Sequence, residues 1–277
     1  MEIADHLLKN GDIDYQESPN HGELMKEGTP DSIVIHYTAG GSLEGAVRTL
    51  CDPERQASAH VVVGRDGAIV QLVPFHTVAW HAGKSSYQGR SGFNKFSVGI
   101  EIDNAGKLTK AESGYSSWFG RNYPEEDVIR AVHRNETEPA YWHKYSENQI
   151  TAVFDLCALL LKTYPIGQIV GHEEISPSRK IDPGPAFPLD KLRERLLDRE
   201  RAEEGPDRLA EDGIVPGRTG MVTASRLNIR SSPSLGADRV APPLASGTPV
   251  EILEESHGWY RVNVRTSGWV KSDFVNV

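Results

Sequence analysis

The chain has 277 residues, a length that accommodates one large domain or two and suffices to bury a sizeable hydrophobic core. Its 30 Lys and Arg residues against 39 Asp and Glu residues give a net charge of −9, and 38% of its residues are hydrophobic. This composition argues against a wholly disordered chain and a disulfide scaffold, and the acidic balance argues against nucleic-acid binding, which requires an excess of Lys and Arg.

In chain order, the apolar pattern predicts a strand at 32–37, a helix at 43–50, strands at 59–63, 68–73 and 97–102, a helix at 146–164, a strand at 168–171 and a helix at 190–201. The Asp66-Gly67 pair between two of these strands is typical of a β-hairpin. Ser146 and Gln149 form a capping box at the start of the long helix. Strands with helices between and after them predict an α/β fold, in which helices flank a mixed central sheet.

The segment between Asn104 and Tyr145 lacks a clean periodicity, although it contains six aromatic side chains. Long irregular segments inside a compact domain are usually functional loops. The alternative is a small local core under the loop, and the sequence leaves both interpretations open.

Residues 199–217 are polar and charged and contain Gly and Pro, as expected of a helix tail that runs into a linker. Residues 218–277 show short alternating apolar runs separated by turn residues, which predicts an all-β barrel. We therefore expect three parts: a large domain at 1–198, a linker at 199–217 and a small domain at 218–277.

The first residues show no basic region followed by an apolar stretch, so no secretory signal is visible. No stretch approaches the roughly 18 apolar residues of a membrane-spanning helix, so no membrane span is expected. The expected location is the cytoplasm, or the outside of the cell after release by another route. Cys157 lies in an apolar run and is expected to be a buried small side chain.

Three potential metal ligands stand where the predicted strands and loops meet. His36 lies at the carboxyl end of one strand, His172 directly follows another, and Asp182 lies in a loop ten residues further on. Active sites of α/β folds gather at the carboxyl ends of strands. Two imidazoles and one carboxylate there are compatible with a catalytic zinc site whose fourth position is open, although the spacing alone is not diagnostic.

Six motifs occur in an order and spacing that resemble a known family. They are residues 33–39, 58–67, 79–83, 94–101, 171–175 and 179–184. Over about residues 15–198, they resemble the zinc-dependent N-acetylmuramoyl-L-alanine amidases, the AmpD-like type 2 amidases. The small domain resembles a bacterial SH3-like (SH3b) module through residues 227–233, 258–262 and 268–270, and such modules commonly target cell-wall peptides.

This resemblance implies a hydrolase that cleaves the amide bond between N-acetylmuramic acid and L-alanine in peptidoglycan or muropeptides. It implies one Zn²⁺ per chain, with His36, His172 and Asp182 as its ligands. It assigns Glu101 the transfer of a proton from the attacking water to the leaving amine, and Lys180 the stabilisation of the oxyanion.

Several of these assignments have alternatives. The alternative for Glu101 is a strand carboxylate that pairs with a cation. The alternative for Lys180 is a solvated charge or a structural partner of Asp182. His81 and Asn94 match positions that line the family's cleft, so they are candidate substrate-binding residues or supports for the ligands.

The alternative function is a non-catalytic peptidoglycan-recognition protein, because the same fold occurs in binding proteins that typically lose a metal ligand. All three ligands are present here, which favours the enzyme. The SH3b module favours the polymeric cell wall as substrate, since tethering raises the effective concentration at an insoluble target. The missing signal favours a cytoplasmic enzyme of soluble muropeptides or one released by a phage-type route, and the oligomeric state stays open.

Overall fold

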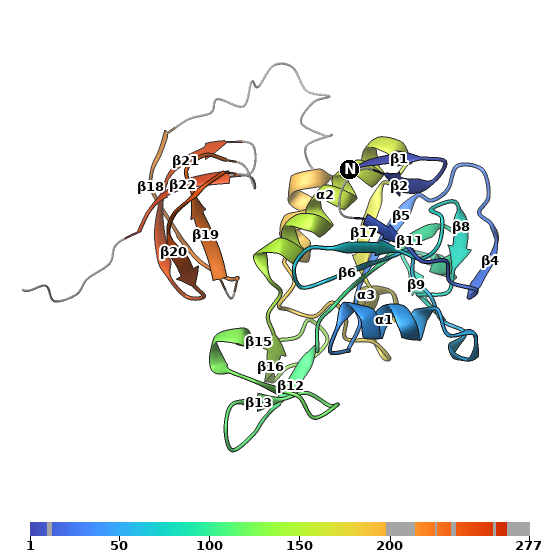
Figure 1. The fold of residues 1–277 in the computed structure, drawn as a ribbon, viewed down its shortest axis with the longest axis horizontal. Helices are drawn as coiled ribbons and strands as arrows, with labels where there is room; N and C mark the ends of the chain where they lie inside the picture. Colours follow the sequence, from blue (N-terminus) through green and yellow to red (C-terminus); the bar gives the residue numbers. More distant parts are fainter. Residues whose placement is uncertain (10–12, 198–213, 225, 234–236, 257–258, 265–277) are drawn as a thin grey trace, which may run out of the picture. The chain divides into compact units, whose positions relative to one another are not determined.

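The computed structural model describes residues 1–9, 13–197, 214–224, 226–233, 237–256 and 259–264 (Figure 1). The chain divides into two compact units, Met1–Pro206 and Asp207–Val277.

A six-stranded mixed sheet forms the centre of the first unit, with the strand order β17-β5-β11-β6-β7-β3. Its strands are β3 (Ile13–Tyr15), β5 (Ser32–Tyr37), β6 (Val61–Val63), β7 (Ile69–Gln71), β11 (Ser97–Ile102) and β17 (Gln168–Gly171). The four strands β17, β5, β11 and β6 run parallel, and β7 pairs with β6 as the antiparallel hairpin expected around Asp66-Gly67. The predicted mixed α/β sheet is confirmed, although the two hairpin strands are shorter than predicted.

In the described part of this unit, four α-helices accompany the sheet: α1 (Leu43–Leu50), α2 (Glu147–Thr163), α3 (His172–Ile175) and α4 (Leu189–Leu196). Ser146 caps α2, where its hydroxyl accepts from the backbone N–H of Gln149 and the Gln149 side chain accepts from the Ser146 backbone N–H. This reciprocal pair is the predicted capping box, and it satisfies two amide groups that the first helical turn leaves unpaired. The predicted last helix extends to residue 201, and its final residues lie outside the described part of the chain.

Alternating side chains give the central sheet two apolar faces. Ile33 and Ile35 of β5 point into the main core, which contains Phe154, Leu156 and other side chains of α2. Val34, between them, points to the opposite face and packs in a separate cluster. Because side chains alternate along a strand, His36 lies on the same face as Val34 and away from the main core.

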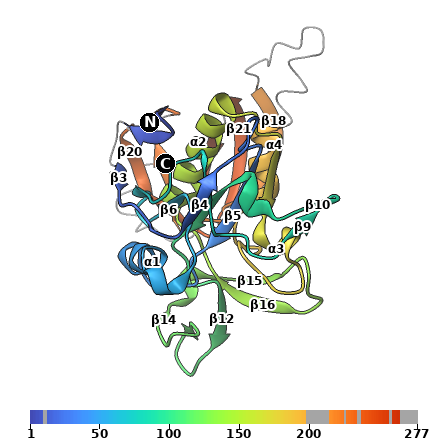
Figure 2. The same ribbon diagram turned by 90° about the vertical axis from the view of Figure 1, so that its right-hand side faces the viewer.

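Residues 104–145 form a second sheet, with the strand order β14-β13-β12-β16-β15 (green in Figure 1, and at the bottom of Figure 2). Its strands are β12 (Lys107–Lys110), β13 (Tyr115–Ser116), β14 (Asn122–Tyr123), β15 (Val128–Val132) and β16 (Pro139–His143). A small apolar cluster, which includes Leu108, Tyr115, Tyr123 and Val128, holds it together. We call this part the insertion sheet. Of the two interpretations that the sequence left open, a functional loop or a small local core, this cluster corresponds to the local core.

Short pairs of strands complete the first unit. They are β1 (Glu2–Ala4) with β2 (Leu7–Lys9), β4 (His21–Leu24) with β8 (Thr77–Ala79), and β9 (Ser86–Tyr87) with β10 (Arg90–Ser91). Single-turn 3₁₀ helices lie at Pro53–Arg55, Phe93–Lys95 and Glu125–Asp127. Cys157 is fully buried, as its apolar surroundings predicted.

The described residues of the second unit form only strands, as predicted. They are β18 (Ile214–Met221), β19 (Arg226–Arg230), β20 (Arg239–Ala245), β21 (Pro249–Ser256) and β22 (Trp259–Asn263), which form the sheets β18-β21-β22 and β19-β20. β18 begins inside the range predicted as a linker, and the apolar run at 268–270 lies outside the described residues. Over the described ranges, none of the helices has the length and apolarity that crossing a membrane requires.

Candidate active site

Three neighbouring parallel strands bring the candidate residues together at their carboxyl ends. In the β5–β11 pair, His36 lies directly beside Glu101. In the β5–β17 pair, Ile35 lies beside Gly171, so His172 follows at the level of His36. The sheet register thus places two imidazoles and a carboxylate side by side, on elements separated by up to 136 residues in the sequence.

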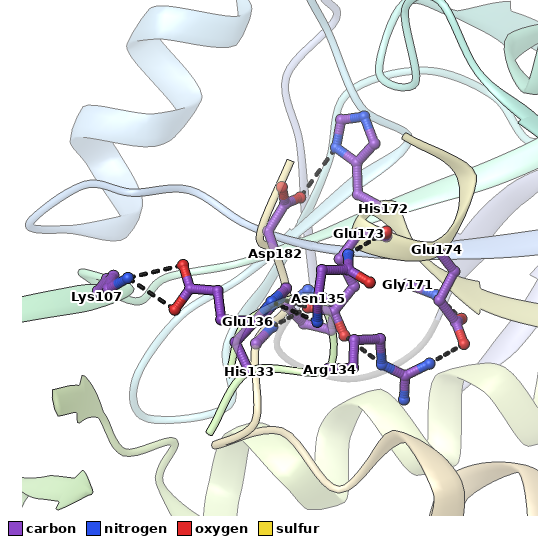
Figure 3. A network of polar contacts seen from close by, with 12 residues as sticks. Lys107, His133, Arg134, Asn135, Glu136, Gly171, His172, Glu173, Glu174 and Asp182 are labelled. Atoms are coloured by element: carbon purple, nitrogen blue, oxygen red, sulfur yellow. Dashed lines mark hydrogen bonds and ion pairs between the residues drawn. The ribbon is translucent and has the colours of Figure 1, made fainter. Parts of the chain in front are cut away.

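His36, His172 and Asp182 converge with their ligand atoms about one hydrogen-bond length apart. His36 Nδ1 lies 2.9 Å from His172 Nδ1 and 3.1 Å from Asp182 Oδ2, and His172 Nδ1 lies 3.0 Å from the same oxygen. Figure 3 shows Asp182 directed at the His172 ring. All three side chains are buried, and together they offer two nitrogen atoms and one oxygen atom that can hold a single metal ion.

The protonation states of these groups suit a metal site. Burial and the neighbouring His172 lower the pKa of His36 to about 4, so its imidazole is neutral at pH 7. Burial alone raises the pKa of Asp182, but hydrogen bonds from His172 and His36 outweigh it and lower the pKa below its usual range. A neutral imidazole and an ionised carboxylate are the forms that bind a metal ion. Two imidazoles and one carboxylate fit a zinc site with an open position.

The outer nitrogen atoms of both histidines have fixed partners. His172 Nε2 lies 3.2 Å from the carbonyl oxygen of Ala82, and His36 Nε2 lies 3.0 Å from His81 Nδ1. His81 Nε2 in turn lies 3.3 Å from the carbonyl oxygen of Ser97. A carbonyl oxygen can only accept a hydrogen bond, so the Nε2 atoms of His172 and His81, which each face a carbonyl oxygen, carry a hydrogen. Nδ1 of His81 therefore has no hydrogen and accepts a hydrogen bond from Nε2 of His36. Such contacts leave the Nδ1 atoms of both ligands free for a metal.

His81 and Asn94 lie behind the ligands in the structure. His81 is buried and packs edge-on against the His36 ring, with ring centroids 5.1 Å apart. Asn94 Oδ1 accepts hydrogen bonds from the backbone N–H groups of His81, at 3.1 Å, and Ala82, at 2.6 Å. These contacts favour a supporting role for both residues over the substrate-binding role that the sequence also allowed.

Glu101 points to the same face of the sheet as His36. Its Oε2 atom is buried and has no hydrogen-bond partner among the described residues. Burial, and secondarily the charge of Asp182, raise the pKa of Glu101 to about 8, against which the charge of Lys180 acts. A buried polar atom without a partner is costly in a folded protein, so this carboxyl is suited to a group that enters the site from outside.

Lys180 is partly buried in the loop between α3 and Asp182, and its charge acts on both His36 and Glu101. Two contacts fix this loop. The backbone N–H of Lys180 donates to the Ser176 carbonyl at 3.0 Å, and Arg179 Nη2 donates to the Lys84 carbonyl at 2.9 Å. The positive charge of Lys180 therefore acts on one candidate metal ligand and on the candidate proton carrier.

The sequence patterns assigned no role to Glu173 and His133, which the structure places directly behind His172 and Asp182. Both are almost completely buried, and their side chains are 2.7 Å apart across 40 residues of sequence. The only signal in the sequence was the carboxylate directly after a ligand histidine. Its partner lies in the segment without periodicity, where no pattern singled it out.

Comparisons with known proteins agree with this geometry. The sequence matches the N-acetylmuramoyl-L-alanine amidase family over residues 26–185 and a bacterial SH3 domain over residues 225–276. The 1,6-anhydro-N-acetylmuramyl-L-alanine amidase AmpD of Enterobacter cloacae is 31% identical over 203 residues, which cover 65% of this chain and 90% of that protein. The N-acetylmuramoyl-L-alanine amidase AmiD of Escherichia coli is 34% identical over 169 residues, which cover 58% of this chain and 51% of that protein.

Among solved structures, a selenomethionine derivative of AmpD is 27% identical, covers 70% of this chain and 98% of that chain, and superposes with a TM-score of 0.48. The family match spans more than half of the chain, and AmpD is matched over nearly its whole length. By these criteria, the chain belongs to the N-acetylmuramoyl-L-alanine amidase family.

Proposed function

We propose that this chain is a zinc-dependent hydrolase of the amide bond between N-acetylmuramic acid and L-alanine. One observation carries the proposal: His36, His172 and Asp182 converge within 3.1 Å of one another at the carboxyl ends of the central strands. Family membership supplies the substrate class, since the relatives are named as muramyl-L-alanine amidases.

The three ligands would hold one Zn²⁺. When bound, zinc acts as a Lewis acid that makes water nucleophilic near neutral pH. The chain's own contribution to that chemistry begins with His81 and the Ala82 carbonyl, which orient the two imidazoles so that both Nδ1 atoms face Asp182.

Glu101 is the proposed proton carrier. Its unpartnered Oε2 can accept a proton from the attacking water and return it to the departing amine of L-alanine. In the metal-free protein, burial raises the pKa of Glu101 to about 8, which makes its carboxylate a stronger base than that of an exposed glutamate. Lys180 is the proposed electrostatic partner of the oxyanion that forms on the attacked carbonyl.

Loss and return of metal test this proposal on the full chain. Chelation should abolish the release of stem peptide from muropeptides, and added zinc should restore it. The His172→Ala protein should stay inactive in the presence of zinc. Full activity of that variant after exhaustive chelation would overturn the proposal, and binding without turnover by the zinc-loaded protein would favour the alternative of a recognition protein.

We further propose three functional parts, a catalytic domain at 1–198, a linker at 199–217 and a cell-wall-targeting domain at 218–277. The match to a bacterial SH3 domain supports the last part. Tethering to an insoluble polymer raises the local concentration of substrate, so we favour intact peptidoglycan as the substrate over soluble muropeptides. Removal of residues 219–277 should slow turnover of purified sacculi and leave turnover of a soluble anhydro-muropeptide unchanged. An equal effect on both substrates would contradict the targeting role.

A further inference from the structure

The insertion sheet contacts the metal-ligand region through a turn at residues 133–136, between β15 and β16. His133 in this turn is fully buried, and its Nε2 lies 2.7 Å from Oε2 of Glu173, the residue that follows the ligand His172. Figure 3 shows the turn and the first residues of α3 meeting in one network of polar contacts. The insertion sheet therefore reaches the ligand-bearing elements directly.

The hydrogen on His133 can be placed from its second contact. The backbone N–H of Asn135 donates to His133 Nδ1 at 3.2 Å, so this nitrogen is an acceptor. Nε2 then carries the hydrogen and donates to Glu173. The imidazole also stacks on the buried ring of Trp142, with centroids 5.5 Å apart and an interplanar angle of 21°. Its orientation is thus fixed by packing as well as by hydrogen bonds.

Glu173 connects the two ligand segments. Its backbone N–H donates to the carbonyl oxygen of Asp182 at 2.8 Å. Its Oε2 also accepts from the backbone N–H of Gly184 at 3.0 Å, two residues beyond that ligand. A displacement of Glu173 would therefore move His172, to which it is covalently joined, and would release the loop that carries Asp182.

Arg134 and Asn135 complete this contact. Arg134 Nε pairs with Glu173 Oε1 at 3.0 Å, and its guanidinium also pairs with Glu174. Asn135 Nδ2 donates to the Glu173 carbonyl at 3.0 Å. The Glu173 side chain thus accepts hydrogen bonds from His133 and Gly184 and forms an ion pair with Arg134, so its charge is balanced inside the protein. Groups behind a metal ligand that are satisfied in this way hold the ligand in a single orientation.

We propose that His133 and Arg134 are positioning residues which, through Glu173, hold His172 and Asp182 at metal-binding distance. The insertion sheet then sets how tightly the site binds zinc. This inference rests on the proposed zinc-dependent function. Neither residue belongs to the three proposed metal ligands or to the proposed catalytic groups Glu101 and Lys180, so their loss should weaken zinc binding while leaving the chemistry of the zinc-saturated enzyme largely intact.

The experiment measures the zinc dissociation constant of the full chain by competition with a chromophoric chelator. His133→Ala should weaken zinc binding by about 10- to 100-fold, the usual effect of removing a group behind a ligand. The kcat and KM at saturating zinc should stay within a few-fold of wild type. His133→Gln should restore most of the affinity, because its side-chain amide again offers an N–H to Glu173.

Glu136→Gln is the matched control. Glu136 lies in the same turn and forms an ion pair with Lys107, at 2.8 Å, and its side chain makes no recorded contact with Glu173. Its loss should leave zinc affinity unchanged. If His133→Ala does not fold, Arg134→Met provides the test, since the Arg134 side chain is 34% exposed and its removal leaves no cavity in the main core.

The outcomes separate this inference from the proposed function. Wild-type protein that binds no zinc would overturn the proposed function itself. Wild-type protein that binds one zinc, together with His133→Ala and Arg134→Met proteins of unchanged affinity, would overturn the positioning role alone. If the two variants keep wild-type zinc affinity but their metal-free forms melt at a lower temperature, the network contributes to folding only.

Discussion

The imidazole of His81 lies against the backbone of Gly99, with no room between them for a side chain. A Cβ atom built on Gly99 would stand 2.4 Å from Cγ and 2.6 Å from Nδ1 of His81. Gly99 is in strand β11, two residues before Glu101, and on the same face of the sheet. The absence of a side chain at this position therefore lets His81 approach the sheet and reach His36 with Nδ1.

Gly99→Ala should displace the His81 ring and break its 3.0 Å contact with His36. We expect destabilisation by about 1–3 kcal/mol, the usual cost of overpacking, and a weaker zinc site. Thermal unfolding of the metal-free protein and a zinc titration check the two effects. A variant with wild-type stability and affinity would show that the ring finds another position at no cost.

Asn94 distinguishes a substrate-binding role from a supporting one. Its Oδ1 holds the backbone of His81 and Ala82, which orient His36 and His172. Asn94→Ala should therefore weaken zinc binding by about tenfold or more and leave KM for a muropeptide unchanged at saturating zinc. Asn94→Asp should keep zinc binding close to wild type, because it retains the accepting oxygen. A raised KM with unchanged zinc affinity would instead support substrate contact.

Glu101→Gln should separate activity from stability. Loss of a general acid–base group lowers kcat by roughly 10²–10⁴-fold. The pKa of Glu101 is about 8 in the folded metal-free protein, compared with the usual value of 4.5 that we take for the unfolded chain. Between these pH values, the folded state therefore binds more protons than the unfolded state. The stability of the metal-free wild type should then fall as the pH rises from 4.5 to 8.

Because Gln resembles the protonated carboxyl, the metal-free variant should be more stable than wild type at pH 8, by about 1 kcal/mol or more, and equally stable near pH 4.5. Unfolding curves of both proteins at the two pH values check this. A variant less stable than wild type at pH 8 would contradict the raised pKa.

His143 should contribute to acid unfolding. Burial lowers its pKa to about 3, and its Nδ1 accepts from the backbone N–H of Ala105 at 3.1 Å. The unfolded chain then binds one more proton between about pH 3 and 6.5, so this contribution to stability is complete above pH 6.5 and is lost as the pH falls toward 3.

His143→Asn removes this titration and keeps an acceptor close to the Nδ1 position. The slope of unfolding free energy against pH between 6.5 and about 4 should decrease by up to about 1.4 kcal/mol per pH unit. Denaturant unfolding across this range provides the measurement, with the metal-free protein used throughout. An unchanged slope would mean that His143 is already protonated in the folded state.

The sequence was informative wherever a local pattern was strong. The strand at 32–37 and the helix beginning after Ser146 were predicted almost to the residue, because a continuous β-branched run and a capping box are local signals. His36 and His172 were recognised as candidates because one lies at the carboxyl end of a predicted strand and the other directly follows one. The family resemblance, rather than spacing, added Glu101 and Lys180 to the candidate site.

The insertion sheet was beyond prediction from these patterns. Its strands have two to five residues, too few to show a period, and several carry polar side chains on both faces. The contact of His133 with Glu173 depends on how this sheet docks against α3, which no local signal encodes. The supporting roles of His81 and Asn94 likewise depend on packing across strands.

The strand register that sets Glu101 beside His36 is required both for a correctly folded sheet and for the proposed chemistry. A slip of β11 by one residue would bring Ile100 or Ile102 beside His36 and would turn Glu101 into the main apolar core. Such a slip would destroy the core and the candidate site together, so selection for a folded chain also preserves the alignment of Glu101 with the proposed ligand His36. The insertion sheet begins only after the end of β11, so its residues lie outside the register that aligns Glu101 with His36. Changes in that sheet therefore leave this alignment untouched.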